Sequence, residues 1–357
     1  MSTTETLVVN KILNIAAERR ATDVHLTAGN YPVLRVDGKL VTLTGEQVLT
    51  PDFLLGMAES FLSKEDRAEL DKEREVVTVY VWANRARFRA KVFYQKGFIA
   101  ISLRLIPQLI RSPKDLGLPA VLTQLITKEK GLIIITGPFG SGRTTTIASL
   151  LETLNRNRGL HIQTLEKPIE YLLANNQSII EQREIGKDTA SFIKGLEDTL
   201  DEDVDVVALT ALDEDGMEEM ILQVAESGKL IIVAMDADTV VSTLERFISN
   251  LEPSRRAWGQ DVLSQVLLGV VAQRLLPRIG GGLSMAYEAL TMTSAVQAII
   301  KDSRFYQLNS IMQTSKEEGM INLDKSLMEL VRVGEVSADD AIGQASDPQV
   351  FKRNFQQ

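Results

Sequence analysis

Residues 137–146 read GPFGSGRTTT and constrain the fold of this chain more than any other stretch. They follow an apolar run at 132–136 and precede a second apolar run at 147–154. Gly137 and Gly142 have the spacing of the phosphate-binding loop G-x-x-x-x-G-K-[ST]. Glycines there let backbone N–H groups turn inward around phosphate oxygens, and the helix behind adds the positive end of its dipole. The pattern favours strand, phosphate loop and helix over a tight turn without a ligand.

One position departs from this pattern, because Arg143 stands where the loop normally has lysine. Arginine keeps the charge, but its planar fork on a longer stem does not place a point charge between the β- and γ-phosphates. We therefore predict that nucleotide binding survives better than phosphoryl transfer. Thr144 keeps the hydroxyl that can reach Mg²⁺. The predicted nucleotide-binding residues of the loop are Gly137, Pro138, Gly140, Ser141, Gly142, Arg143, Thr144 and Thr145, with Thr144 as the predicted metal ligand.

Length and composition exclude several other functions. A chain of 357 residues is long for one core and indicates two domains with a helical appendage. The formal net charge is −9, which disfavours binding to nucleic acid or to an anionic membrane. With no cysteine and two histidines, a disulfide, a thiolate zinc site or a histidine-based metal site is not expected.

The N-terminus lacks the pattern of a signal peptide, and the longest apolar runs are too short to cross a bilayer. We expect a cytoplasmic protein without direct membrane insertion, which meets the inner membrane only through partners.

The first part of the chain predicts an α+β domain that ends near Pro107. Spaced apolar residues predict helices at 4–20 and 54–70. Alternation around Asp37-Gly38 predicts a hairpin within 21–40, and three β-rich runs lie between 76 and 105. A linker at 108–117 follows.

Beyond the linker, short apolar runs alternate with amphipathic helices, which indicates an α/β class with a mostly parallel sheet. Ligands bind at the carboxyl ends of such strands, where the glycine loop lies. Helices are then predicted at 240–250 and 258–276, a turn at 280–282 and almost only helix from 295. The predicted domains are 1–107, a linker at 108–117, a nucleotide-binding domain at 118–282 and a helical region at 283–357.

Several stretches together resemble the secretion-type motor ATPases, and especially the PilT/PilU branch that powers type IV pilus retraction. Residues 21–40 resemble that branch's Ser-Asp-x-His-Leu and Arg-Val-Asp-Gly signature. The further stretches that resemble the family lie at 87–89 with Gln95 and Gly97, 104–107, 131–146, 164–171, 182–184, 225–228, 269–276 and 313–327. The resemblance therefore covers nearly the whole chain.

This resemblance implies a homo-hexameric ring in which a PAS-like N-terminal domain and a RecA-like P-loop domain clamp Mg-ATP or ADP. Arg87 and Arg104 match family arginines that touch the nucleotide, although pairing with carboxylates between the domains is an equal alternative. Glu166 and Glu170 match the family's acidic motif, and Glu170 stands where a glutamate activates water. The expected partners are an active PilT-like paralogue and the platform protein of the pilus in the inner membrane.

The chain departs from the family pattern mainly at positions that carry chemistry. Lys167 replaces the aspartate after the first glutamate of the acidic motif. The Walker B strand at 205–210 leads into Ala211 where the family has glutamate, so a carboxylate that acts through magnesium or water is lost. Asp213 would compensate only if that strand continued, because side chains on one face repeat every two residues.

Further departures fall at expected coupling positions. The two histidines of the family's histidine box align with Lys229 and Asp236, and two expected arginines align with Glu197 and Asp201. The retraction signature Ala-Ile-Arg-Asn-Leu-Ile reads Ala-Val-Gln-Ala-Ile-Ile near 295–301. Loss of one such electrostatic group commonly lowers a rate on the order of 10²-fold or more. We therefore predict a pseudo-ATPase that acts as a regulatory or structural subunit; the alternatives are an active retraction motor and a scaffold that binds no nucleotide.

Overall fold

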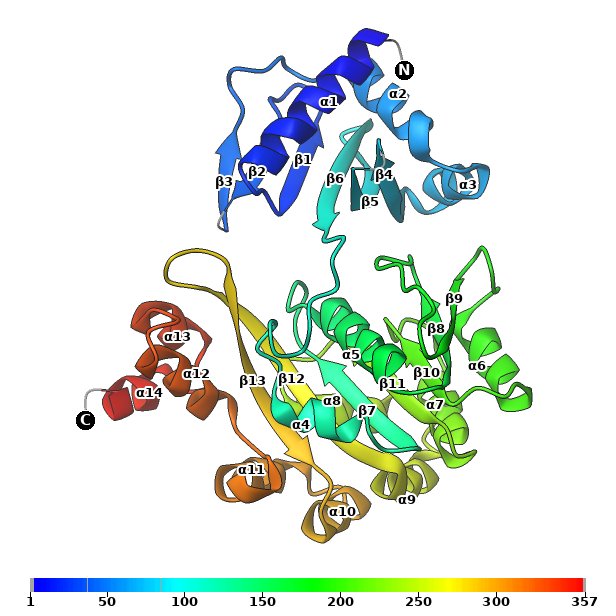
Figure 1. Cartoon of the computed structure of the whole chain (residues 1–357), viewed down its shortest axis with the longest axis vertical. Helices are drawn as coiled ribbons and strands as arrows, with labels where there is room; N and C mark the ends of the chain where they lie inside the picture. Colours follow the sequence, from blue (N-terminus) through cyan, green and yellow to red (C-terminus); the bar gives the residue numbers. More distant parts are fainter. Residues whose placement is uncertain (1–2, 37, 84, 356–357) are drawn as a thin grey trace. The chain divides into compact units, whose positions relative to one another are not determined.

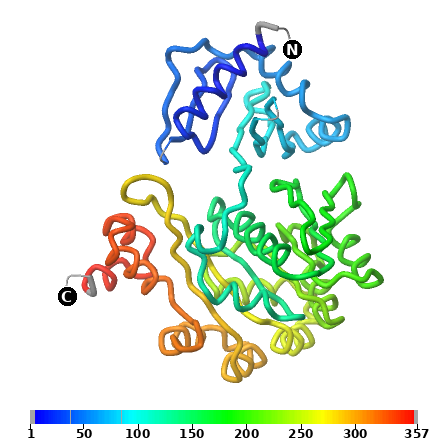
Figure 2. The backbone as a smooth tube through the Cα atoms, viewed as in Figure 1, coloured from blue at the N-terminus to red at the C-terminus, as the bar shows by residue number. Residues whose placement is uncertain are grey.

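The computed structural model describes residues 3–36, 38–83 and 85–355 and divides by internal contacts into two compact units (Figure 1). The first, the N-terminal unit, comprises residues 1–109 and the short segment 167–171. The second, the C-terminal unit, comprises residues 110–166 and 172–357. The break after residue 109 falls within the predicted linker, and the backbone can be followed through both units in Figure 2.

The N-terminal unit is built on an antiparallel sheet in the order β3-β2-β1-β6-β5-β4. Inward-facing residues alternate along the strands, as in β5, where Phe88, Ala90 and Val92 are buried. They share one apolar core with Ile12 and Leu13 of the first helix. The elements of this unit are α1 (Thr3–Glu18), β1 (Asp23–Thr27), β2 (Val33–Val36), β3 (Lys39–Thr42), α2 (Pro51–Phe61), α3 (Lys64–Glu73), β4 (Glu75–Trp82), β5 (Ala86–Gln95) and β6 (Phe98–Ile106).

The N-terminal unit differs from the sequence prediction in its second helical stretch. The single helix predicted at 54–70 is wrong, because the chain forms α2 and α3 with a break before Ser63. The Ser63 hydroxyl accepts from the N–H of Asp66, and the Asp66 carboxylate accepts from the N–H of Ser63, which starts a new helix. Strands β2 and β3 pair as the hairpin prediction requires, whereas Asp37 of its turn lies outside the described residues.

The C-terminal unit contains a mostly parallel sheet in the order β13-β12-β7-β11-β10-β8-β9, in which only the pair β12 and β13 is antiparallel among the described strands. The predicted α/β class is therefore confirmed. Its strands are β7 (Gly131–Thr136), β8 (His161–Glu166), β9 (Ile179–Glu184), β10 (Val206–Leu209), β11 (Leu230–Met235), β12 (Leu267–Pro277) and β13 (Leu283–Thr291).

Helices cover both faces of this sheet, so its central strands are buried on both sides. In β7, Ile133 and Ile135 pack with α4 (Ala120–Leu125) and α5 (Arg143–Asn157). The alternate residues Leu132 and Ile134 belong to the core on the opposite face. That core is formed with α6 (Phe192–Asp201), α7 (Met217–Glu226), α8 (Val240–Ser249) and α9 (Arg256–Val266).

The helix predicted at 258–276 is wrong beyond residue 266, where the chain enters β12. The glycines at 280–282 lie between β12 and β13, which pair from Gly269 and Thr291 to Pro277 and Leu283, so the turn joins a hairpin. Strand β13 lies inside the stretch predicted as a helical region, and β9 was not predicted.

The chain after β13 is mainly helical, as predicted. The last three helices pack Leu323, Leu327 and Phe351 against Leu276 and Ala286 of the β12–β13 hairpin. The elements are α10 (Ser294–Lys301), η1 (Phe305–Gln307), α11 (Leu308–Thr314), η2 (Lys316–Glu318), α12 (Leu323–Arg332), α13 (Ala338–Gln344) and α14 (Pro348–Phe355). No helix within the described residues is long and apolar enough to span a bilayer.

Candidate functional site

The glycine loop connects the carboxyl end of β7 to the start of α5, as the sequence predicts (Figure 1). Gly137 has φ +150°, and a Cβ atom there would lie 2.3 Å from the backbone oxygen of Gln273. A side chain at this position would therefore force the loop away from the neighbouring strand β12. The turn that follows is closed by the N–H of Ser141, which donates to the Pro138 carbonyl over 3.1 Å.

The N-terminus of α5 has the properties of an anion site. Gly142 is its N-cap with φ +91°, and no side chain caps the helix among the described residues. The first turn holds no acidic residue, and Thr144 and Thr145 are half-buried there. The first N–H groups of a helix have no partner within it and lie at the positive end of its dipole. The first N–H groups of α5 therefore form a cradle that can donate hydrogen bonds to phosphate oxygens.

Ser141 adds a hydroxyl to the cradle. Its side chain is almost fully buried, at 3% exposure, and its Oγ has no hydrogen-bond partner among the described residues. A Cβ built on Gly137 would lie 2.6 Å from this oxygen, so the hydroxyl lies over the loop's first glycine. Buried hydroxyls in proteins are normally hydrogen-bonded, and a phosphate oxygen is one acceptor that suits this position.

Gln273 of β12 holds the loop in place and was missed by the sequence predictions. Its Nε2 donates to the Ser141 carbonyl over 2.7 Å, and its Oε1 accepts from the Thr146 hydroxyl over 2.9 Å. The side chain is completely buried. It therefore ties the loop and the first turn of α5 to the neighbouring strand. The available signal was a glutamine within an apolar run, but that run was interpreted as helix.

Arg143, the predicted phosphate ligand, is bound to the end of strand β11. Its Nη1 donates to the carbonyls of Gly137, over 2.8 Å, and Met235, over 2.6 Å. The same nitrogen forms an ion pair with the carboxylate of Asp236. The Arg143 side chain is 16% exposed and that of Asp236 is 61% exposed. The sequence marked both positions as departures from the family pattern but did not indicate that they meet.

The Walker B position is occupied by Ala211, which has no carboxylate. Strand β10 ends at Leu209, and Ala211 packs against the apolar core. Asp205 precedes the strand, where its carboxylate accepts from the N–H of His161 over 2.8 Å. The compensation considered for Asp213 required β10 to continue, so its premise is wrong.

Glu166, a predicted catalytic residue, ends strand β8 and is buried. Its Oε1 accepts from the Thr164 hydroxyl over 2.7 Å and from the Gln182 amide over 2.9 Å. In the sheet order, β10 and β11 lie between β8 and β7. Three strand spacings of about 4.8 Å separate Glu166 from the strand that leads into the loop by about 14 Å. Its part in catalysis stays a prediction.

Glu170, Arg87 and Arg104 all belong to the N-terminal unit, whereas the glycine loop belongs to the C-terminal unit. Arg87 donates to the carbonyls of Glu170, over 2.8 Å, and Ile169, over 3.0 Å. Arg104 pairs with the buried carboxylate of Asp23 over 2.9 Å, so its ion pair lies within its own unit. The predicted contact of both arginines with nucleotide stays a prediction.

The carboxylate of Glu170 lies 3.5 Å from Arg89. Burial raises the pKa of Glu170, although Arg89, Arg104 and Arg87 act in the opposite direction. A carboxylate with a raised pKa is better suited to accept a proton than an ordinary surface glutamate. This property agrees with the role that the resemblance implies for Glu170, which stays a prediction.

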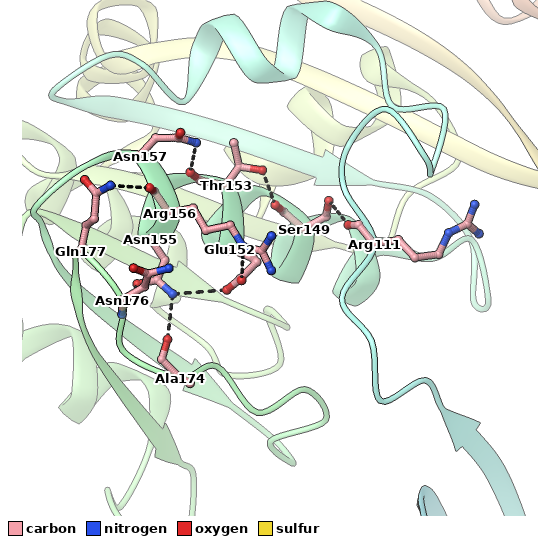
Figure 3. A network of polar contacts seen from close by, with 10 residues as sticks. All are labelled: Arg111, Ser149, Glu152, Thr153, Asn155, Arg156, Asn157, Ala174, Asn176 and Gln177. Carbon is pink, nitrogen blue, oxygen red and sulfur yellow. Dashed lines mark hydrogen bonds and ion pairs between the residues drawn. The ribbon is translucent and has the colours of Figure 1, made fainter.

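Helix α5 is also fixed along its length to two other segments of the C-terminal unit (Figure 3). The Ser149 hydroxyl donates to the carbonyl of Arg111 over 2.7 Å. Near the end of the helix, the Asn155 amide donates to the Ala174 carbonyl over 2.8 Å and accepts from the N–H of Asn176 over 3.0 Å. Helix α5, which begins at the glycine loop, is therefore held by hydrogen bonds to residue 111 and to residues 174–176.

The metal-binding capacity of the loop is small. Within residues 3–36, 38–83 and 85–355, no group of three or more His, Cys, Asp and Glu could hold a metal ion. Thr144 is half-buried at the start of α5, and its part as a Mg²⁺ ligand stays a prediction. Mg²⁺ commonly keeps several waters and binds substrate phosphates, so one protein ligand is compatible with a metal that arrives with its nucleotide.

Comparison with known proteins agrees with this geometry. The pattern of the family described as Type II/IV secretion system protein matches residues 2–281. The type IV pilus retractation ATPase PilT of Pseudomonas aeruginosa is 30% identical over 348 residues, which cover 96% of this chain and 99% of the relative. The type IV pilus ATPase PilU of the same organism is 30% identical over 336 residues, which cover 94% of this chain and 88% of the relative.

A crystal structure of the pilus retraction motor PilT with bound ADP is similar with a TM-score of 0.82 and 35% identity, covering 96% of this chain and 98% of that one. The match of the family pattern to most of the chain, the two relatives of nearly full length and the shared fold agree with one another. The chain therefore belongs to the type II/IV secretion system protein family, in its PilT/PilU-like branch of twitching-motility ATPases.

Proposed function

We propose that this chain binds ATP or ADP at the glycine loop and hydrolyses ATP very slowly or not at all. It acts as a regulatory or structural subunit of type IV pilus machinery. The observation that carries the proposal is a glycine loop that keeps its place between β7 and α5, while the residues at its cation position and at the Walker B position have both changed.

The support for binding comes from the loop itself. Gly137 and Gly142 keep the conformations that the loop needs, the N-terminus of α5 has no side-chain cap within the described residues, and the buried Ser141 hydroxyl has no partner there. The similar PilT structure contains ADP. Nucleotide phosphates are the ligands that suit such a cradle.

The support for weak hydrolysis comes from two positions. Arg143 replaces the lysine and forms an ion pair with Asp236, and Ala211 replaces the glutamate after β10. Removing one group that stabilises a transition state typically costs on the order of 10²–10³-fold in rate. Two such losses leave a turnover far below the usual range of about 1–10³ s⁻¹.

The proposed assembly follows the pilus relatives. The chain joins a ring of six copies, or a mixed ring with an active paralogue, and contacts the platform protein of the pilus in the inner membrane. It resides in the cytoplasm and reaches the membrane through these partners. Its net charge of −9 supports protein partners over nucleic acid.

The test combines thermal stability with phosphate release on the full-length chain. Mg-ATP and Mg-ADP should each raise the thermal midpoint, because a ligand of the folded state adds roughly 2.7 kcal/mol at about one hundred times Kd. Phosphate release should stay at background. The matched control is Arg143→Ala, which should lower the ligand-induced shift.

A double variant, Arg143→Lys with Ala211→Glu, tests whether only the chemistry has been lost. It should release phosphate faster than the wild-type chain if the rest of the machinery remains. Turnover by the wild type that Arg143→Ala abolishes would identify an active motor instead. The absence of any ligand-induced shift would favour a scaffold that binds no nucleotide.

A further inference from the structure

The contact between Arg143 and Asp236 joins two departures from the family pattern that are far apart in sequence. Arg143 begins helix α5, and Asp236 directly follows strand β11. Strand β11 pairs with β7 as far as Met235 and Thr136, so the ends of these strands bring the two side chains together. The cation of the phosphate loop is thus paired with a carboxylate of this chain.

We propose that Asp236 is an intramolecular competitor of nucleotide phosphate for Arg143 and sets the nucleotide affinity of the loop. Carboxylate and phosphate are both preferred partners of a guanidinium group, and both bind it through oxygen. While Asp236 is paired with Arg143, the pair presents little net charge to an incoming polyanion. This inference rests on the proposed binding of ATP or ADP at the same loop.

The exposure of the two side chains indicates which of them moves. Asp236 is 61% exposed, so its carboxylate is hydrated when it leaves the pair. Arg143 is only 16% exposed and is also held by the carbonyls of Gly137 and Met235. The carboxylate therefore moves away from the guanidinium, which stays beside the loop and donates to the phosphate oxygens.

The backbone around Asp236 is fixed independently of its carboxylate. Arg246 donates to the Asp236 carbonyl over 2.6 Å, and the Thr136 hydroxyl donates to the carbonyl of Ala237 over 3.0 Å. These contacts use main-chain oxygens, so Asp236→Asn should leave the segment in place. The variant keeps the shape of the side chain and removes its charge.

The experiment measures equilibrium Kd values of the full-length chain for Mg-ADP and Mg-ATP. Asp236→Asn should bind both about 1.5-fold to fivefold more tightly than the wild type, which is the range expected for loss of a partly exposed ion pair. The matched control is Asp238→Asn. Asp238 is also exposed and lies two residues away, so this variant makes the same change in net charge and should stay close to the wild type.

A second set of variants distinguishes competition for Arg143 from a general electrostatic repulsion between the Asp236 carboxylate and the nucleotide. In an Arg143→Ala background, Asp236→Asn should no longer tighten binding, because the cation for which it competes is absent. The unliganded Asp236→Asn chain should be no more stable than the wild type even though it binds nucleotide more tightly. If Asp236 had only a structural role, its substitution would change nucleotide affinity and the stability of the unliganded chain together.

Three results would overturn the inference. Asp236→Asn could bind no more tightly than a wild type that does bind, Asp238→Asn could tighten binding equally, or the effect could persist without Arg143. Each leaves the proposed function intact. If neither the wild type nor Asp236→Asn binds nucleotide at millimolar concentration, the proposed function fails and the inference fails with it.

Discussion

Gln273 is the side chain on which the shape of the glycine loop depends most directly. It is completely buried and makes one hydrogen bond to the Ser141 carbonyl and one to the Thr146 hydroxyl. A buried carbonyl or hydroxyl that loses its partner keeps the cost of its desolvation. Gln273 therefore contributes more to the stability of the folded chain than an exposed glutamine would.

We expect Gln273→Met, which keeps the approximate volume, to lower the free energy of unfolding by about 2–4 kcal/mol, because two buried polar groups lose a partner. Urea denaturation measures this loss. The nucleotide-induced thermal shift should fall as well, because the loop is no longer fixed. Gln265→Met on the exposed side of α9 is the control and should stay within about 0.5 kcal/mol. Equal effects of the two variants would contradict the role of Gln273.

Glu288 of β13 is a buried carboxylate that accepts from the N–H of Val240 at the start of α8. Burial raises its pKa, Asp324 adds to the increase, and the Val240 N–H and Arg274 oppose it. A folded-state pKa above the unfolded value means that the folded chain holds the proton more tightly. Its contribution to stability is therefore complete below the usual glutamate range and is lost as the pH rises through the raised pKa.

Glu288→Gln should remove this pH dependence while retaining an oxygen for Val240. We predict that its stability relative to the wild type increases from pH 5 to pH 8, as measured by urea denaturation at each pH. Glu317→Gln changes an exposed carboxylate and serves as the control. If the free energy of unfolding of Glu288→Gln relative to the wild type stays constant or falls as the pH rises, the predicted direction of the pKa shift of Glu288 is wrong.

At the scale of elements, helix α5 connects the glycine loop to the segments that its far end contacts. Asn155 is buried and bonds to Ala174 and Asn176, whereas Asn157 is exposed and donates to the Thr153 carbonyl of its own helix (Figure 3). The two asparagines differ in what they hold: Asn155 fixes another segment, and Asn157 does not.

We expect Asn155→Ala to lower the free energy of unfolding by about 0.5–1.5 kcal/mol, because the Ala174 carbonyl and the Asn176 N–H lose a hydrogen-bond partner. Asn157→Ala should cost less than about 0.5 kcal/mol. Hydrogen exchange should also show faster exchange at 174–176 in Asn155→Ala alone. The idea fails if the two variants are equally stable or if exchange at these residues is unchanged.

The elements that the sequence predicted well are those with strong local signals. The apolar run before the glycines and the helix after them are β7 and α5. Strand β12 was missed because it is buried on both faces, so its apolar run lacks the alternation of a half-exposed strand. The break between α2 and α3 was readable in principle, since Ser63 and Asp66 have the spacing of a capping box.

At the scale of the whole molecule, the sequence predicted the position of the glycine loop but not that Gln273 holds it in place. Gln273 and Ser141 are 132 residues apart, and only the order of β12, β7 and β11 brings such residues together. The pairing of Arg143 with Asp236 has the same origin, because β11 and β7 are neighbours in the sheet. Local pattern predicts local structure, whereas contacts of this kind depend on topology.

Equilibrium dialysis against Mg-ATP tests in one sample whether the chain binds ATP and whether it consumes the ATP that it binds. After dialysis, chromatography identifies the nucleotide on each side of the membrane. We predict excess ATP on the side of the full-length protein and no more ADP than in a buffer control. ADP that accumulates with the wild type but not with Arg143→Ala would show an active motor, and equal ATP on both sides would show that the loop does not bind it.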